Sequence, residues 1–320
     1  MKALVTGAAG FIGRHLCTAL VEGGHEVTAL DRKIDSRHFL DPVRLYEADC
    51  TNASDLEKAL DGIDTVFHLA GVKRAKKASL YHEVNVGGTS VLLAACERRG
   101  GIRRLLFISS LAASGPSGPD RRLREVDEPK PVNEYGRSKL QAEKILAGGF
   151  VPWTVIRAPV VYGPGIKDTI FLLVGLAARH IQPVIRSGKA NVIYVGDLVS
   201  GLITAAESQR SENRLYYFAH PRVYKWSEIH DTVRDIVGTW TVRIRLPFIV
   251  LTSVARVADA VATLSRARLA FSQRNLEDIR HPYWMVDVSR AKKELGFEAQ
   301  VGLKEGIKRL FEWQKTITVV

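Results

Sequence analysis

Cysteine is scarce in this sequence. The 320 residues include only Cys17, Cys50 and Cys96, which are odd in number and widely spaced. A disulfide scaffold or a zinc site needs cysteines in pairs at short spacing, so both are excluded. The nine histidines show no metal-ligand spacing either, and no metal is expected. The three cysteines are expected to be reduced thiols, and none is a candidate nucleophile.

Long apolar runs are absent as well. The two longest, "IFLLVGLAA" from Ile170 and "LPFIVLTSVA" from Leu246, fall short of the roughly 20 residues that a membrane-spanning helix needs. The chain opens with "MKALVTGAAG", which lacks the long apolar core and the cleavage site of a secretory leader. We therefore expect a cytoplasmic protein with no membrane span, and peripheral contact with a membrane stays open.

Acidic residues are outnumbered by basic ones. Lysine and arginine total 46 against 34 acids, a net charge of +12 that would suit nucleic acid, an anionic membrane or an anionic small ligand. The basic residues are dispersed in short clusters such as "KRAKK" at 73–77, and no platform of aromatic residues accompanies them. Nucleic acid is therefore not an expected partner, and a small-molecule substrate is.

Short aliphatic runs alternate with helical stretches through the first half of the chain, which predicts an α/β fold with a doubly wound parallel sheet of the Rossmann type. The predicted strands are 2–6, 26–30, 43–47, 65–69, 104–109 and 154–157, and the predicted helices are 11–22, 54–60, 80–99 and 134–146. We expect a dinucleotide-binding domain at 1–163, to which 190–220 returns, and a smaller, mostly helical substrate-binding lobe at 164–189 and 221–320.

A glycine-rich loop follows the first predicted strand. In "VTGAAGFIGRHL" the glycines are Gly7, Gly10 and Gly13, and an amphipathic helix follows. Glycines at this spacing let the chain turn tightly, let the backbone approach a pyrophosphate and let the helix pack close to the sheet. The helix N-terminus offers N–H groups to the phosphates. The loop predicts a dinucleotide site, with Phe11 and Ile12 among its residues.

An acid stands at the end of the second predicted strand. Asp31 lies at the distance from the glycine loop at which a carboxylate accepts hydrogen bonds from the adenosine ribose. A carboxylate there repels a 2′-phosphate and favours NAD, whereas the following Arg32 and Lys33 could pair with that phosphate and would suit NADP. Asp49, after the third strand, could hold the adenine edge or be an ordinary loop aspartate, and Cys50 beside it is counted with it among the cofactor-binding residues.

The stretch "NEYGRSK" at 133–139 places Tyr135 and Lys139 four residues apart. On a helix this spacing puts both on one face, with Asn133 as the helix cap. A free tyrosine, with a pKa near 10, is a poor base at neutral pH. An ammonium about 5 Å away, at an effective dielectric of about 20, favours a phenolate by roughly 3 kcal/mol, or about two pKa units. By itself the pair could equally be an ordinary surface helix start.

Six blocks together resemble the extended branch of the short-chain dehydrogenase/reductase superfamily, the NAD-dependent epimerase/dehydratase family. They are "TGAAGFIG" at 6–13, "HLAG" at 68–71, "NVGGT" at 85–89, "ISSLAASG" at 108–115, "YGRSK" at 135–139 and "RAPVVYGPG" at 157–165. The resemblance implies a catalytic set of Ser110, Tyr135 and Lys139, with Ser109 as the runner-up serine. For the cofactor it implies Leu69, Ala70, Gly71, Lys73, Asn85, Pro159 and Val160, with Lys73 equally readable as a solvated member of its basic run.

Two of these blocks separate the reactions of the family. Leu111 and Ala112 follow Ser110, where dehydratases of this branch usually carry an acidic pair. Val160 stands where many nucleotide-sugar epimerases carry an asparagine, and the block then looks like that of 3β-hydroxysteroid dehydrogenases and dihydroflavonol-reductase-like proteins. The stretch from Leu246, with Val254, Val257, Val261 and Leu264 near helical spacing, resembles the same group and could line an apolar pocket, rest on a membrane or pack on its own lobe.

These features predict an NAD(P)-dependent oxidoreductase that transfers a hydride at a hydroxyl or carbonyl carbon, with Tyr135 as the acid/base. Its substrate would be an apolar alcohol or ketone. The alternative is a UDP-sugar 4-epimerase acting on a nucleotide sugar, and a second alternative is a dinucleotide-binding subunit without catalysis. The family habit also implies a homodimer formed by the helices that begin near Leu80 and Tyr135.

Overall fold

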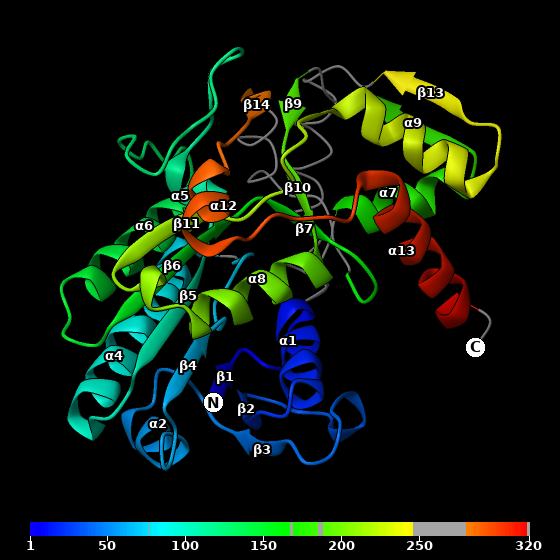
Figure 1. Cartoon of the computed structure of the whole chain (residues 1–320). Coiled ribbons are helices and arrows are strands. Elements are labelled where there is room, and N and C mark those ends of the chain that lie inside the picture. Colours follow the sequence, from blue (N-terminus) through cyan, green and yellow to red (C-terminus); the bar gives the residue numbers. More distant parts are fainter. Residues whose placement is uncertain (76, 167–168, 185–187, 246–279, 319–320) are drawn as a thin grey trace.

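The computed structural model describes residues 1–75, 77–166, 169–184, 188–245 and 280–318 (Figure 1). Its centre is a sheet of seven parallel strands in the order β11-β6-β5-β4-β1-β2-β3. The strands are β1 (Lys2–Thr6), β2 (Glu26–Asp31), β3 (Arg44–Glu47), β4 (Thr65–His68), β5 (Arg104–Ser110), β6 (Trp153–Ala158) and β11 (Arg214–Tyr217). The strand order reverses between β1 and β4, where doubly wound sheets bind their ligands. The predicted Rossmann-type fold is confirmed.

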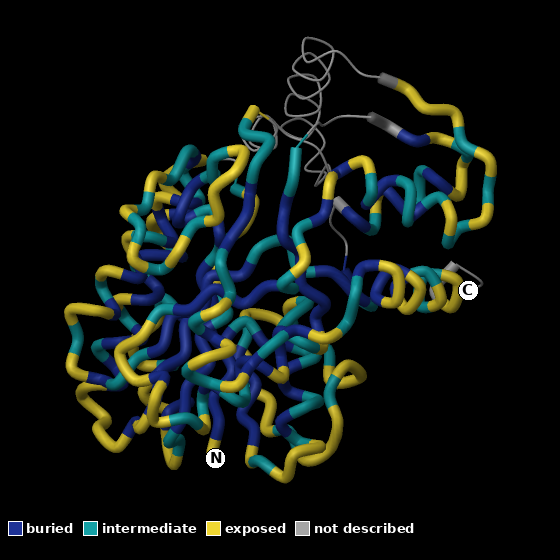
Figure 2. Tube along the Cα trace, turned by 45° about the horizontal axis from the view of Figure 1, so that its top comes forward, coloured by how far each residue is buried: buried dark blue, intermediate teal, exposed yellow. Residues whose placement is uncertain are grey.

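Helices cover both faces of this sheet, and the alternation of side chains along the strands explains why. In β1, Ala3 and Val5 are buried in one apolar cluster and Leu4 in another. The first cluster takes in α1 (Phe11–Glu22) and α8 (Val195–Glu207), and the second takes in α2 (Ala53–Ala59), α4 (Gly88–Arg99) and α6 (Glu134–Ala147). Apart from β3, an edge strand with mostly exposed residues, the strands are accordingly largely buried in the interior of the molecule (Figure 2).

The predicted helix at 80–99 is interrupted in the structure. It consists of α3 (Ala78–Tyr81), a π-helical turn η2 (His82–Gly87) and then α4. The wider turn surrounds Asn85, whose side chain bonds to the backbone of Val72 instead of facing solvent. Sequence periodicity does not reveal such a turn, because it depends on a partner elsewhere in the chain.

Smaller elements follow the large sheet. They are η1 (Ser36–His38), α5 (Leu111–Ser114), β7 (Val160–Tyr162), α7 (Thr169–Ala177), β8 (Ile181–Val184), β9 (Lys189–Ala190), β10 (Val192–Tyr194), η3 (Gln209–Ser211), β12 (Tyr224–Lys225), α9 (Trp226–Val237), β13 (Val242–Arg245), β14 (Tyr283–Trp284), α12 (Ser289–Leu295) and α13 (Leu303–Thr318). Strand β11 joins the large sheet beside β6, whereas β10 pairs with β7. The helix proposed around Val254 to Leu264 lies outside the described residues. The division into two domains stays a prediction.

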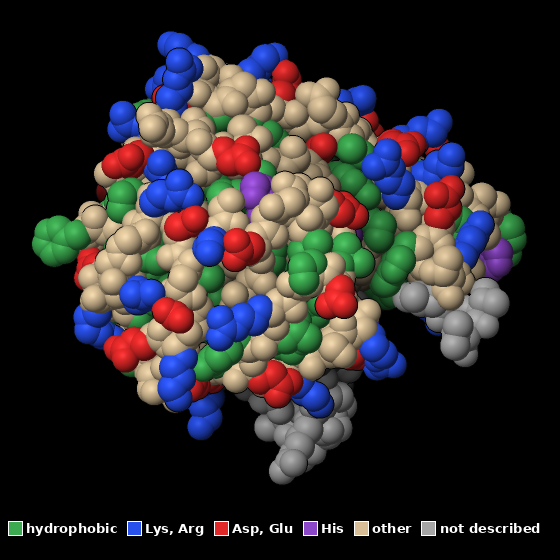
Figure 3. All heavy atoms as spheres, turned by 60° about the horizontal axis from the view of Figure 1, so that its bottom comes forward, with side chains coloured by type: hydrophobic (Ala, Val, Ile, Leu, Met, Phe, Trp, Pro, Cys, Tyr) green, Lys and Arg blue, Asp and Glu red, His purple; other side chains and the backbone are tan. Residues whose placement is uncertain are grey.

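Basic and acidic side chains are interspersed on the face that carries the lower part of the sheet in Figure 1 (Figure 3). The exposed ion pairs of the protein include Arg98 with Glu57 and Arg99 with Asp61, each at 2.9 Å. Among the helices that the structure describes, none has the length and apolar character to cross a membrane.

Candidate active site

The glycine loop forms a narrow cradle between β1 and α1. Gly7 has a φ of +70°, and a Cβ built on it would lie 2.7 Å from the backbone nitrogen of Ala70. A Cβ on Gly13 would meet the carbonyl oxygen of Gly7. Only glycine fits at both positions, which brings α1 against β1 and the loop against the segment after β4. Helix α1 begins after Gly10, which has no side chain to cap it, so its first N–H groups remain available to an anion.

Asp31 lies beside this loop at the end of β2. Its Oδ2 accepts a hydrogen bond from the Ala9 nitrogen at 3.1 Å, and its Oδ1 accepts one from the Arg32 nitrogen at 2.8 Å. The carboxylate is therefore fixed next to the turn that would hold the pyrophosphate, while the Arg32 side chain is exposed. A glycine cradle, an uncapped helix N-terminus and a fixed carboxylate form a donor and acceptor set that fits a dinucleotide.

Asp49 and Cys50 follow β3. Asp49 Oδ1 accepts hydrogen bonds from the nitrogen and the hydroxyl of Thr51, at 2.9 and 2.8 Å. Cys50 is buried, and its sulfur lies 3.2 Å from where a Cβ of Gly88 would be. Burial raises the pKa of the Cys50 thiol to about 11, so the thiol stays protonated at neutral pH and packs as an apolar group.

A buried histidine, which the sequence analysis did not single out, orders the end of β4. His68 Nδ1 lies 2.7 Å from Thr6 Oγ1 and its Nε2 lies 3.0 Å from Thr89 Oγ1. The Thr89 hydroxyl donates to the Asn85 carbonyl at 2.7 Å, so it accepts from Nε2–H, and the Thr6 hydroxyl donates to Nδ1. Burial lowers the pKa of His68 to about 3 and keeps it neutral. The chain of bonds ties β1, β4 and α4 together just before Leu69, Ala70 and Gly71.

Asn85 joins the next segment to α6. Its Oδ1 accepts from the Val72 nitrogen at 2.7 Å, and its Nδ2 donates to Ser138 Oγ at 2.9 Å. A Cβ on Gly71 would lie 3.0 Å from Asn85 Oδ1 and 3.9 Å from Lys139 Nζ. The structure therefore brings together Gly71, Asn85 and Lys139, which the sequence separates by up to 68 positions.

Lys139 is buried at this junction. Its Nζ lies over the ring of Phe107, 4.0 Å from the ring centroid. Burial lowers the pKa of Lys139 to about 7, and the Glu143 carboxylate, one turn along α6, acts in the opposite direction. If "NEYGRSK" were an ordinary surface helix start, Lys139 would be solvated. It is instead buried against an aromatic ring.

Tyr135 lies in the first turn of the same helix. As predicted, Asn133 caps α6 by accepting a hydrogen bond from the Gly136 nitrogen at 2.8 Å. The Tyr135 ring is half-buried, with its centroid 6.2 Å from that of Tyr81. Because α6 is continuous from Glu134 to Ala147, Tyr135 and Lys139 are one turn apart on one side of it.

Ser110 and Ser109 end β5 with different partners. Ser110 is half-buried and caps α5, since its Oγ accepts from the Ala112 nitrogen at 3.2 Å. A Cβ on Gly136 would meet the Ala112 carbonyl, so α5 packs closely against the start of α6 and brings Ser110 near the helix of Tyr135. Ser109 is buried and donates a hydrogen bond to Glu143. The geometry favours Ser110 over Ser109 as a residue that contacts substrate.

A buried polar network behind the site was missed in the sequence analysis. The Glu143 carboxylate accepts from Arg157 Nε at 3.0 Å and from Nη2 at 2.6 Å. Arg157 Nη1 donates to Ser114 Oγ at 3.1 Å, and the Tyr217 hydroxyl lies 2.9 Å from the same oxygen. The available signal was the spacing of four from Lys139 to Glu143, which puts the acid on the same side of α6.

The other predicted cofactor residues lie at the edges of the site. Lys73 is exposed in the loop after β4, and its carbonyl accepts from the Tyr81 hydroxyl at 3.4 Å. Pro159 links β6 to β7. Val160 begins β7, pairs with Val192 of β10 and packs against the large apolar cluster.

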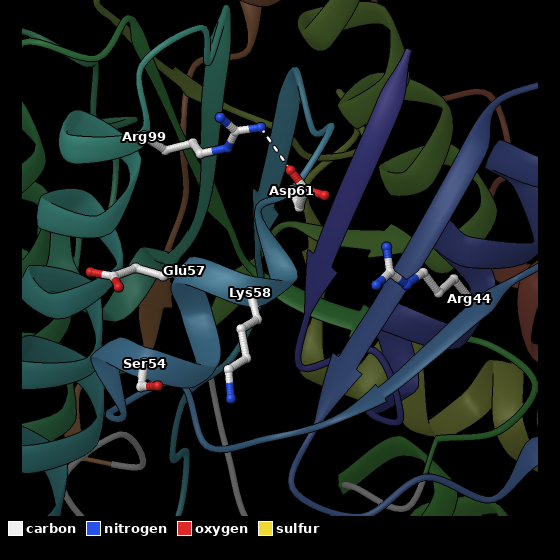
Figure 4. A pocket seen from close by; sticks show the side chains of 6 residues that line it. All are labelled: Arg44, Ser54, Glu57, Lys58, Asp61 and Arg99. Carbon is white, nitrogen blue, oxygen red and sulfur yellow. Dashed lines mark hydrogen bonds and ion pairs between the residues drawn. The ribbon is translucent and has the colours of Figure 1, made fainter.

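One surface hollow lies elsewhere, on α2, β3 and α4 (Figure 4). Charged side chains dominate its lining, and Arg99 in it bonds to Asp61. None of the predicted site residues is among those that line it, which are Arg44, Ser54, Glu57, Lys58, Asp61 and Arg99. We therefore place no chemistry there.

Comparison with known proteins identifies relatives over most of the chain. The model of the NAD dependent epimerase/dehydratase family matches residues 3–217. A 2-alkyl-3-oxoalkanoate reductase of Stenotrophomonas maltophilia is 28% identical over 97% of this chain and 98% of its own. A UDP-glucose 4-epimerase of Vibrio cholerae is 26% identical over 96% of this chain and 93% of its own. The solved structure of MoeE5 in complex with UDP-glucuronic acid and NAD is 26% identical, with a TM-score of 0.79 over 99% of this chain and all of that one.

These relatives include a reductase and an epimerase, so the prediction of an enzyme is confirmed. The prediction of NAD as cofactor is likewise confirmed for the family and its solved members. The comparisons contain both oxidoreductases and UDP-sugar epimerases. The roles of the individual site residues stay predictions, because they rest on geometry and resemblance.

Proposed function

The chain belongs to the NAD-dependent epimerase/dehydratase family, and we propose that it is an oxidoreductase that acts on a hydroxyl or carbonyl carbon of an apolar substrate. The observation that carries the proposal is the placement of Lys139. It is buried beside Gly71, the residue after Ala70, whose backbone lies against Gly7 of the glycine loop, and it is one helical turn from Tyr135. Tyr135, as the proton-transfer group, and Lys139, as the cation that stabilises its phenolate, would thus lie beside a dinucleotide site.

Each residue then has a chemical task. NAD, when bound, supplies the hydride acceptor or, reduced, the donor. Tyr135 takes the proton from the substrate hydroxyl during oxidation, or returns it to the carbonyl oxygen during reduction. The Lys139 ammonium stabilises the Tyr135 phenolate. The Ser110 oxygen already accepts from the Ala112 nitrogen, which leaves its O–H to donate to the substrate oxygen and hold it at Tyr135.

Val160 supports an apolar substrate. It is half-buried at the start of β7 and packs with apolar neighbours, at the position where many nucleotide-sugar epimerases place an amide. The 2-alkyl-3-oxoalkanoate reductase relative acts, by its name, on an oxo group of an alkyl-bearing molecule. We place the cofactor in residues 1–163 with 190–220, and the substrate between these and the lobe of 164–189 and 221–320.

The second candidate is a UDP-sugar 4-epimerase. It is favoured by the UDP-glucose 4-epimerase relative, by the UDP-glucuronic acid in the MoeE5 structure and by the net charge of +12, which suits a diphosphate. A dinucleotide-binding subunit without catalysis is the third, and the presence of Ser110, Tyr135 and Lys139 argues against it. For the assembly we propose a homodimer in which α4 and α6 pair with their copies.

The test compares net redox chemistry with isomerisation. Purified protein is mixed with NAD+ or NADP+ and a panel of long-chain secondary alcohols, and separately with UDP-glucose and UDP-glucuronic acid. The proposal expects reduced cofactor to accumulate with the alcohols. Interconversion of a UDP-sugar without net change of cofactor, together with no turnover of any alcohol, would replace it by the epimerase.

Tyr135→Phe tests the proposed mechanism in whichever reaction is found. It should reduce turnover by roughly a hundredfold or more and leave binding of NADH, followed by its fluorescence, unchanged. Tyr46→Phe, a change of the same kind on β3, is the control and should behave as the parent. Parent-like turnover of Tyr135→Phe would remove this residue from the mechanism.

A further inference from the structure

Arg14 follows the third glycine of the cradle and lies at the end of the first turn of α1. Its backbone nitrogen donates to the Gly10 carbonyl at 3.1 Å, so the residue belongs to the regular helix. Its side chain is half-buried, and within the part of the chain that the structure describes its guanidinium makes no hydrogen bond and no ion pair. A guanidinium carries five N–H donors, so those of Arg14 remain available to a ligand.

The Arg14 guanidinium reaches back along the first turn of the helix. Side chains of a helix lean towards its N-terminus, and positions three apart lie on one face, so Arg14 and Phe11 are neighbours. The turn after β7 lies against both of them. A Cβ on Gly165 would be 3.7 Å from Phe11 Cδ2 and 3.8 Å from Arg14 Nη2. Arg14 Nη2 and the ring at the first position of α1 therefore lie against the same glycine.

His15 holds this turn against α1. Its Nε2 lies 2.8 Å from the carbonyl oxygen of Pro164, which can only accept, so Nε2–H donates. The imidazole ring also packs edge-on against Phe11, with the ring centroids 5.6 Å apart. Ile166, at the end of the turn, is buried in the large apolar cluster. The turn is thus a fixed wall beside the Arg14 guanidinium.

The charges on α1 oppose the dipole of the helix. Its first turn contains no acid and is followed by Arg14, whereas its last turn contains Glu22 and no basic residue. The N-terminus of a helix carries a partial positive charge, so a cation close to it is unfavourable and an anion is favourable. The unfavourable position of Arg14 becomes favourable when an anion binds at the same helix end.

We propose that Arg14 binds the pyrophosphate of the dinucleotide, together with the N–H groups at the start of α1. A guanidinium can donate two parallel hydrogen bonds to phosphate oxygens, and such charge-assisted bonds are the strong ones. The two charged side chains of the cradle then divide the cofactor between them. Arg14 takes the anionic pyrophosphate, and the Asp31 carboxylate takes the ribose hydroxyls. This role goes beyond the proposed reaction, because an oxidoreductase and an epimerase both need the cofactor.

The test is fluorescence titration of the full chain with NADH, and displacement of NADH by ADP-ribose and by adenosine. ADP-ribose retains the pyrophosphate, whereas adenosine lacks it. Arg14→Gln should weaken the binding of NADH and of ADP-ribose by roughly ten- to a hundredfold and leave that of adenosine unchanged. Arg14→Lys should retain part of the affinity, because it keeps the charge and loses the paired donors. Salt should weaken NADH binding more in the parent than in Arg14→Gln.

Unfolding midpoints separate this role from a structural one. Without ligand, Arg14→Gln should unfold at the same temperature as the parent or at a higher one, because the change removes a cation from a helix N-terminus. At one fixed concentration of NADH the midpoint should rise less in the variant than in the parent, because the ligand binds more weakly. A ligand-free midpoint below that of the parent would indicate a structural role and overturn the proposal.

Arg44→Gln is the matched control. Arg44 is an exposed arginine of β3, so the change removes the same charge from the same domain and should leave NADH affinity unchanged. The proposal fails if Arg14→Gln binds NADH as the parent does, if adenosine binding weakens as much as ADP-ribose binding, or if Arg44→Gln has an equal effect. A diphosphate also occurs in UDP-sugars. Weaker binding of UDP-glucose with parent-like binding of NADH would assign Arg14 to a substrate instead. None of these measurements depends on the enzymatic reaction.

Discussion

Arg157 of β6 holds the Glu143 carboxylate of α6 in a two-point ion pair beneath the site, with distances of 3.0 and 2.6 Å. Both side chains are almost fully buried. A buried charge without its partner is costly, so the pair acts as a fixed joint between the helix that carries Tyr135 and Lys139 and the central sheet.

Glu143→Gln tests this joint. The change leaves the Arg157 guanidinium buried without a counter-charge, and the free energy of unfolding should fall by about 3–5 kcal/mol. Urea denaturation measures it. Glu57→Gln removes the partner of Arg98 from an exposed pair and should cost less than about 1 kcal/mol. Equal losses of unfolding free energy in the two variants would show that burial does not increase the contribution of the Arg157–Glu143 pair to stability.

Buried Lys139 should make the stability of the parent protein depend on pH, and Lys139→Met should remove that dependence. The pKa of Lys139 is about 7 in the folded protein and near its ordinary 10.5 in the unfolded chain. Between these values the unfolded chain binds more protons, so this residue makes the free energy of unfolding rise with pH. Below about 7 the cost of burying the ammonium is fully present.

The variant, which lacks that ammonium, should therefore be more stable than the parent below pH 7 and should lose this advantage as the pH approaches 10.5. Urea denaturation across this range measures the difference. Lys144→Met, at an exposed position of the same helix, is the control and should show no such trend. A difference between Lys139→Met and the parent that stays constant with pH would contradict the assignment.

Asp31→Ser should alter the preference for the cofactor. The change removes the carboxylate that would bond to the ribose hydroxyls and repel a 2′-phosphate, while the Arg32 side chain remains exposed beside it. Hydrogen bonds to a charged group contribute about 1.5–3 kcal/mol, so NADH affinity should fall roughly ten- to a hundredfold as NADPH affinity rises. Fluorescence titration gives both constants. Asp35→Ser, a change of the residue just before η1, should leave the ratio of the two affinities unchanged. An unchanged ratio in Asp31→Ser would show that the ribose binds elsewhere.

Gly13→Ala should damage the cradle. The added methyl would meet the Gly7 carbonyl oxygen and lie 2.7 Å from Ala8 Cα, so α1 must move away from β1. Overpacking of this kind costs about 1–3 kcal/mol of stability, and NADH should bind more weakly because the helix N-terminus shifts. Gly148→Ala, where the new Cβ would be 3.6 Å from its neighbours, is the control. Tight NADH binding by Gly13→Ala would indicate that the phosphates lie outside this loop.

The sequence predicted the parts of the fold that depend on local patterns. The predicted strands and the helices at 11–22 and 134–146 agree with the structure to within a residue or two, because hydrophobic alternation and the Asn133 cap are readable along the chain. The break at η2 was not predicted, since it is set by the bond from Asn85 to Val72. The choice between Ser110 and Ser109 as the catalytic serine also depended on hydrogen-bond partners elsewhere in the chain. Ser109 is buried and bonds to Glu143, whereas Ser110 is half-buried and caps α5.

The hydrogen-bonded chain through His68 fixes the ends of β1 and β4 and the start of α4 before any ligand arrives. Asn85 extends this frame to Val72 and to Ser138 of α6. A site whose walls are already held together by hydrogen bonds loses little conformational entropy when a ligand binds. Most of the contact energy therefore remains available as affinity. The enzyme is in this sense preorganised, and amide hydrogen exchange at 68–72 should be slow with or without cofactor.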